Sequence, residues 1–296
     1  MPTLYTLKES NIRKTYLLIS IFLLLIIGIG WIFSYIFEST EILIIAAVFA
    51  ILTSVTSYWY SDKIVLYMTK ARPVKKEDNP ELYRIVENLC ITAGLPMPKV
   101  YIIEETQPNA FATGRDPKHA VIAVTRGLLE KLERVELEGV IAHEISHIKN
   151  RDILLQTVIV ILAGIISISA EFLLRSLWWS DRRRREGNEI FYILGLIAVI
   201  LAPIAATLIR LAISRKREFL ADASGALLTR YPEGLARALE KISSDPNPLR
   251  VANNSTAHLF IISPFRGKSA KTWLTKLFMT HPPVEKRIRA LRGMKI

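Results

Sequence analysis

Four long apolar segments constrain the fold of this chain more than any other feature. They run from Tyr16 to Phe37, from Ile42 to Tyr60, from Ile153 to Leu174 and from Ile190 to Ile209. Each approaches the roughly 20 residues that a helix needs to cross the hydrocarbon core of a bilayer. The first is too long for a cleavable signal peptide, whose apolar part spans about 7–15 residues. We therefore expect a mostly helical membrane protein with four apolar helices.

The distribution of charge predicts how the chain is oriented in the membrane. Cations precede the first apolar segment and follow the second, whereas the connection between the two carries only Glu38 and Glu41. By the positive-inside rule, the N-terminus and the polar segment after Tyr60 face the cytoplasm of a multi-pass protein in the cell (plasma) membrane. We therefore expect the lipid bilayer to be the partner of the net positive charge of +12. No nucleic-acid partner is expected, because basic and aromatic residues do not alternate as in nucleic-acid-binding proteins.

The third and fourth apolar segments leave two topologies open. Arg182–Arg185 lie between them, and the positive-inside rule disfavours four arginines in an external loop. Glu171 lies within the third segment, and a carboxylate at membrane depth usually faces protein or a water-filled cavity. The two segments either span the membrane or form a partly inserted hairpin.

The chain divides into a membrane hairpin (1–62, helices 16–37 and 42–60), a first globular part (63–152), two apolar helices (153–174 and 190–209 within 153–212) and a second globular part (213–296). In the first globular part, Asn79-Pro80 and Gly94 delimit a helix over 81–93. Residues 99–104, 109–113 and 120–125 have strand composition, and a small antiparallel sheet is their simplest arrangement. Helices are expected over 126–132, 135–149, 213–228, 232–242 and 282–292.

The chemistry is indicated by His143-Glu144-Ile-Ser-His147. Residues four apart share one face of a helix, so the two imidazoles can bind one ion. Glu144 is turned about 100° from His143, so that its carboxylate can reach a water on the metal without occupying a coordination position. The pattern predicts a zinc site with Glu144 as the catalytic base.

A catalytic zinc site needs three protein ligands, and the second predicted ligand helix supplies a candidate. Glu218 and Asp222 are again four residues apart, so Glu218 is the predicted third ligand. Asp222 is placed to accept the outer N–H of a ligating histidine. Taken alone, these residues would be interpreted as a solvated, salt-bridged helix face.

At this point the chain resembles the HtpX-like membrane zinc metalloproteases, which are related to the CAAX prenyl proteases. The resemblance covers nearly the whole length. In that family the two histidines and the later glutamate bind one zinc per chain, the pentad glutamate is the base, the aspartate supports a ligand, and the catalytic domain is α+β and zincin-like, of the gluzincin type. The matching segments are 94–98 (GLPMP), 107–114 (QPNAFATG), 143–152 (HEISHIKNRD), 217–222 (REFLAD), 280–283 (THPP) and 285–288 (EKRI).

The resemblance also implies roles that spacing does not reveal. Asn109 and Ala110 would lie on an edge strand that holds an extended substrate by β-augmentation. His281 would bind substrate or steady the oxyanion, although a structural histidine ahead of Pro282-Pro283 is the alternative. His119 and His258 have no partner at ligand spacing and are expected to be surface or loop residues.

These observations predict a zinc metalloendopeptidase whose active site faces the cytoplasm. The resemblance implies protein or peptide substrates, in particular misfolded membrane proteins. A CAAX-type protease is one alternative, but four apolar helices are few to enclose the large intramembrane chamber it would need. The other is a non-enzymatic protein with a structural metal site, in which an unliganded Glu144 would have no use.

Overall fold

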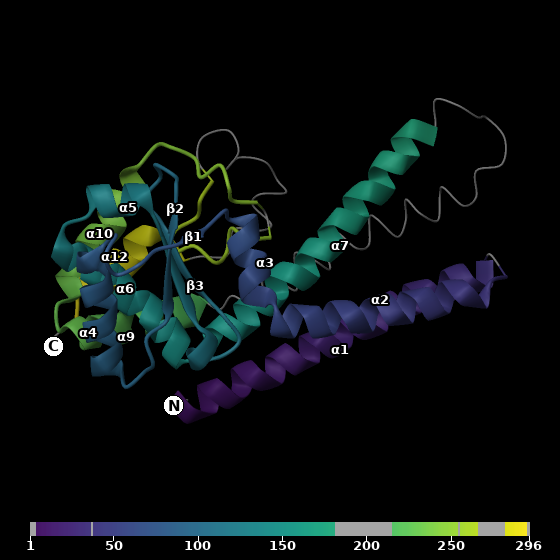
Figure 1. The fold of residues 1–296 in the computed structure, drawn as a ribbon, viewed down its shortest axis with the longest axis horizontal. Helices are drawn as coiled ribbons and strands as arrows, with labels where there is room; N and C mark the ends of the chain where they lie inside the picture. Colours follow the sequence, from purple (N-terminus) through teal and green to yellow (C-terminus); the bar gives the residue numbers. More distant parts are fainter. Residues whose placement is uncertain (1–3, 37, 181–214, 254, 266–281, 295–296) are drawn as a thin grey trace.

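The computed structural model describes residues 4–36, 38–180, 215–253, 255–265 and 282–294 (Figure 1). Two long helices, α1 (Leu4–Ile36) and α2 (Thr40–Trp59), lie side by side and extend away from a globular unit. Both are long and apolar enough to cross a membrane, by length and composition. Side chains such as Leu24 and Ile45 are 73% and 67% exposed, a cost in water that the acyl chains of a bilayer remove. The first two predicted apolar helices are therefore confirmed as helices.

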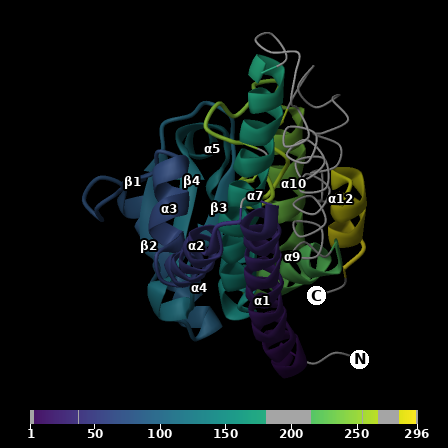
Figure 2. The ribbon, with the colours of Figure 1, turned by 90° about the vertical axis from the view of Figure 1, so that its right-hand side faces the viewer.

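The third apolar segment forms α7 (Asp152–Ser180), which begins inside the globular unit. Its first turns pack on α1, with Leu18 and Phe22 against Leu155 and Val158. Beyond this contact α7 and the α1–α2 hairpin diverge (Figures 1 and 2). The fourth predicted helix (190–209), the Arg182–Arg185 loop and the side chain of Glu171 lie outside what the structure describes. Whether the last two apolar segments span a membrane stays a prediction.

The sheet has four strands in the order β1-β2-β4-β3, with bounds β1 (Arg72–Pro73), β2 (Lys99–Ile103), β3 (Ala110–Thr113) and β4 (Val121–Thr125). The pairs β1–β2 and β3–β4 are antiparallel, but β2 and β4 are parallel. The expected antiparallel sheet is therefore wrong for this pair. Every residue of β4 is buried, so this strand takes a central place between β2 and β3. After β3, the chain turns back and places β4 between β3 and β2, where β4 runs parallel to β2.

Both faces of the sheet are covered, which explains the continuous burial of its last two strands. On one face, Ala110, Ala112 and Ile122 pack in a core with α4 (Pro80–Ala93) and α6 (Arg134–Lys149). On the other face, Phe111 and Ala123 contact a second cluster that includes residues of α3 (Ser61–Met68), α7 and the 249–260 segment. The sheet thus fixes β3 next to α6.

The remaining helices are α5 (Arg126–Lys131), α9 (Arg215–Thr229), α10 (Pro232–Ser244) and α12 (Val284–Arg292), with a short 3-10 turn, η1 (Pro117–His119), before β4. Of these helices, α9 and α10 pack directly on α6, α12 packs on α9 and α10, and α5 packs on β4. The predicted ends of α4 are confirmed, because the side chain of Asn79 accepts the N–H of Leu82 and Gly94 adopts the left-handed conformation with φ 69°. Helix α6 lies in the middle of this assembly, packed against α4, α9 and α10 (Figure 1).

Candidate metal centre

The two histidines of the pentad converge from one face of α6. Residues 139–148 of this helix are all buried, so its backbone is held on every side. The N-terminus is fixed by a capping box between Glu133 and Glu136. The Nε2 atoms of His143 and His147 lie 3.1 Å apart. The helix therefore presents two imidazole nitrogens to one point.

Glu218 approaches the same point from α9. Its Oε2 is 3.9 Å from Nε2 of His143, and its Oε1 is 3.7 Å from Nε2 of His147. Glycine at 225, seven residues later on the same face of α9, lets the two helix backbones touch, because a Cβ there would lie 2.9 Å from the backbone nitrogen of His143. The close contact between α6 and α9 brings Glu218, 71 positions after His147, into the site.

The three groups fit a zinc ion. Two ligands about 2.1 Å from an ion, at a tetrahedral angle, lie about 3.4 Å apart, and the observed separations of 3.1, 3.7 and 3.9 Å lie on either side of that value. The buried charged groups also favour a cation. Carboxylates outnumber guanidiniums around the site by four to two; they are Glu144, Asp152, Glu218 and Asp222, with Arg217 and Arg287.

Each histidine has a carboxylate at its outer nitrogen. Nδ1 of His143 lies 2.9 Å from Asp222, and Nδ1 of His147 lies 3.0 Å from Asp152. Such partners fix the tautomer of a ligating imidazole and direct its Nε2 at the metal. Asp222 is held in turn by Arg287, whose Nε and Nη2 donate to its two oxygens at 2.8 and 2.7 Å.

Glu144 is buried beside the ligands, with its carboxylate accepting the backbone N–H of Ala112 in β3. Its Oε1 has no hydrogen-bond partner within the described part of the chain. Burial raises the pKa of Glu144 to about 7, and the charge of Glu218 acts in the same direction. A carboxylate in this state can take up and release a proton near neutral pH.

The two histidines differ in their electrostatic surroundings. Burial lowers the pKa of His143, which favours the neutral imidazole that binds metal. Burial also opposes a charge on His147, but its hydrogen bond to Asp152 and the nearby Glu218 outweigh that effect and raise its pKa to about 9. In the metal-free protein His147 therefore carries a proton at neutral pH, and a metal ion would have to displace it.

The predicted substrate strand lies next to Glu144, but its edge is partly engaged. Asn109 is fully buried and its Nδ2 donates to the carbonyl of Ile262 at 3.0 Å. The carbonyl of Ala110 accepts the N–H of Ile261 at 3.0 Å. The segment around Ile261 and Ile262, which follows α10, therefore lies along the outer edge of β3.

Sequence reasoning missed several supporting residues of the site. Asp152 and Arg287 both lie in segments that resemble the family, 143–152 and 285–288, but the resemblance assigns neither of them a role. His258 lies in a turn, as the loop alternative predicted, but it is buried there, with Nε2 3.3 Å from the carbonyl of Gln156. His281 lies outside the described residues.

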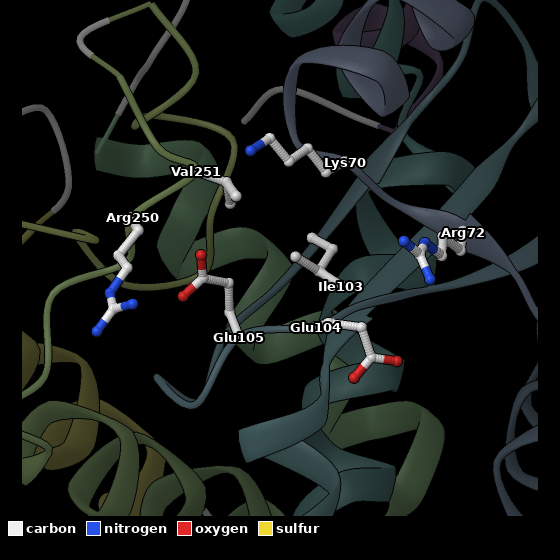
Figure 3. A pocket seen from close by; sticks show the side chains of 7 residues that line it. All are labelled: Lys70, Arg72, Ile103, Glu104, Glu105, Arg250 and Val251. Carbon is white, nitrogen blue, oxygen red and sulfur yellow. The ribbon is translucent and has the colours of Figure 1, made fainter.

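A cavity of about 330 Å³ lies elsewhere, between the end of α3, the end of β2 and the 250–251 loop (Figure 3). Lys70, Arg72 and Arg250 line it together with Glu104 and Glu105. None of its lining residues belongs to the metal centre, so the cavity plays no part in the chemistry considered below.

Comparisons with known proteins show which sequences this chain is similar to. The protease HtpX homolog of Thermoanaerobacter pseudethanolicus is 50% identical over 299 residues, covering 99% of this chain and 98% of the relative. That of Pyrococcus furiosus is 52% identical over 283 residues, covering 94% of each. Among solved structures, S. mikatae Ste24p matches with a TM-score of 0.49 at 20% identity, covering 97% of this chain and 67% of that one.

The sequence resemblance to HtpX-like proteins is confirmed by these relatives. The sequence model of peptidase family M48 matches residues 76–295, which include helices α6 and α9, strands β2, β3 and β4, and helix α12. The match therefore covers well over half of the chain, and the HtpX relatives align along almost all of it. This chain belongs to peptidase family M48.

Proposed function

We propose that the protein is a membrane-bound, zinc-dependent endopeptidase. The observation that carries this proposal is the convergence of His143, His147 and Glu218 within 4.8 Å of one another in a buried site, with the unliganded carboxylate of Glu144 beside them. A closed structural site has four protein ligands and needs no free carboxylate, whereas a catalytic site keeps one position open.

In this proposal zinc supplies one kind of chemistry. Held by these residues, it would act as a Lewis acid that polarises the substrate carbonyl and lowers the pKa of water toward about 7. Glu144 accepts the proton of the attacking water and holds it on its free oxygen. It then donates that proton to the leaving amine, a transfer in both directions that a pKa near 7 permits.

The substrate is proposed to bind as an extended strand along the outer edge of β3. Asn109 and Ala110 would hold its main chain, as in other β-augmentation complexes. The N–H of Ile261 now occupies the carbonyl of Ala110, so a substrate strand would take the place of that contact. His281 is proposed to stabilise the oxyanion, since an imidazolium can donate to developing negative charge.

The cellular setting belongs to the same proposal. The charge bias around α1 and α2 favours an active site on the cytoplasmic side of the cell membrane. The relatives named protease HtpX homolog support proteolysis, and we propose misfolded membrane proteins as the substrates, as the family resemblance implies.

Metal content and proteolysis together test the proposal. Replacement of His143, His147 or Glu218 by alanine should each remove bound zinc and casein hydrolysis from the detergent-purified protein, because each change leaves two ligands. His119→Ala is the matched control, since His119 is exposed and pairs with Asp116. Full zinc occupancy in Glu218→Ala would show that the third ligand has been misassigned.

A further inference from the structure

One polar residue of the first membrane helix reaches the metal centre. Asn11 lies in α1, a few residues before the apolar stretch, and is 3% exposed. Its Nδ2 donates to Oδ1 of Asp152 at 2.7 Å and to the carbonyl of Asn150 at 3.2 Å. The two residues it contacts lie about 140 positions further along the chain.

Asp152 is the carboxylate that orients His147. Its Oδ2 accepts from Nδ1 of His147 at 3.0 Å, while its Oδ1 accepts from Asn11. Arg151, with φ 59°, turns the chain between α6 and α7 so that Asp152 faces back toward α6. The two oxygens of one carboxylate therefore join a membrane helix to a predicted metal ligand.

Asn11 also contacts the helix of the third ligand. Its Oδ1 accepts from Nη1 of Arg217 at 3.1 Å, and the same guanidinium lies 3.5 Å from Asp152. Arg217 immediately precedes Glu218 on α9. One amide thus bonds to the carboxylate that orients His147 and to the residue that precedes Glu218.

Packing alone does not account for an asparagine here. A buried amide is costly unless its donors and acceptor are all paired, and an apolar residue would fill the same space at lower cost. Asn11 uses both donors and its acceptor, toward Asp152, the carbonyl of Asn150 at the end of α6, and Arg217. Among the described residues, Oδ1 of Asp152 would keep only Arg217 at 3.5 Å without it, and the carboxylate could rotate away from His147.

We propose that Asn11 is a positioning residue of the metal centre, through which α1 fixes the orientation of Asp152 and hence of His147. The N-terminal hairpin is then part of the support of the active site as well as a membrane anchor. This inference rests on the proposed function, because it takes His147 as a metal ligand.

The test measures zinc affinity by competition with a chromophoric chelator. The full chain is purified in detergent and carries Glu144→Gln to prevent self-cleavage. Outer partners of metal ligands typically contribute about 10–100-fold in affinity. We expect a loss of that size for Asp152→Ala and about 10-fold for Asn11→Ala. Asn11→Asp keeps the size and the acceptor for Arg217 but sets an oxygen against Asp152, so it should weaken zinc binding as well.

Thr15→Val is the matched control. Thr15 is buried one turn later on α1, and its hydroxyl bonds only to the backbone carbonyl of Asn11 among the described contacts. This variant should bind zinc as the parent does, whatever its melting temperature. Asn11→Asp keeps the test decisive if Asn11→Ala fails to fold.

The outcomes separate the two proposals. Unchanged zinc affinity in both Asn11 variants, with His147→Ala abolishing binding, would overturn the role of Asn11 and leave the proposed function standing. Unchanged affinity in His147→Ala would overturn the metal site itself. An equal loss of affinity in Thr15→Val would show that α1 acts only through general stability, which also contradicts the inference.

Discussion

Gly225→Ala should damage the metal centre without altering any ligand. Gly225 lies on the face of α9 that also carries Glu218 and Asp222, and it meets the backbone of α6 at His143. An alanine Cβ would lie 2.9 Å from the nitrogen of His143 and 3.1 Å from the carbonyl carbon of Ala142, whereas ordinary contacts begin at 3.4 Å. The two helices would therefore have to separate by about 0.5 Å.

The size of the effect follows from two opposing terms. Alanine favours a helix over glycine by about 1 kcal/mol, but overpacking a core costs about 1–3 kcal/mol. The protein should therefore be destabilised by up to about 2 kcal/mol. A functional site has to be held within about 0.5 Å of its geometry, and Glu218 is already 3.9 Å from Nε2 of His143. We expect zinc affinity to fall about 10-fold.

Chelator competition measures the zinc affinity of the purified protein, and thermal melting measures its stability. Leu227→Ala is the control on the same helix, because that side chain is 61% exposed and the change leaves the α6 contact intact. If Gly225→Ala bound zinc and melted as the wild type does, the close contact between α6 and α9 would not position Glu218.

Arg287→Lys should lower zinc affinity and the melting temperature, because lysine cannot make the paired bonds to Asp222, while Arg289→Lys, an exposed neighbour, should change neither. In the zinc-free wild-type protein, the raised pKa of His147 contributes about 3 kcal/mol of stability that is complete below pH 6.5 and lost as pH rises through about 9. Melting followed from pH 6 to 10 should show this fall, and zinc-loaded protein should not. Lys118→Cys should react with a maleimide only from the cytoplasmic side. Cys90 should stay unlabelled, because it is buried and burial raises the pKa of its thiol to about 11. Labelling of Lys118→Cys from outside would contradict the topology.

Local signals were sufficient for the elements that carry the ligands. The cap at Asn79 and the left-handed Gly94 act within one turn, so they mark the ends of α4 without knowledge of the fold. The spacing of His143 and His147 likewise depends only on the geometry of one helix. For the same reason, the alignment of Glu218 with Asp222 could be read from four residues of sequence.

The rest depends on contacts between distant parts of the chain. The parallel pairing of β2 and β4 follows from the strand order, in which β3 takes the edge and β4 returns between β3 and β2, and no strand reveals that order alone. Arg287 reaches Asp222 across 65 positions and Asn11 reaches Asp152 across 141. Each appears in the sequence as one polar residue near a helix, where a solvent-facing role is the ordinary interpretation.

The separate job assigned to Glu144 is the central claim, and one comparison tests it directly. Glu144→Gln keeps the size and polarity of the side chain but removes the proton acceptor, and loss of a general base costs about 10²–10⁴ in rate. Zinc content and casein hydrolysis should be measured together on purified wild type and Glu144→Gln. We expect wild-type zinc content with hydrolysis lowered by that factor. Hydrolysis near the wild-type rate by the zinc-loaded variant would contradict it.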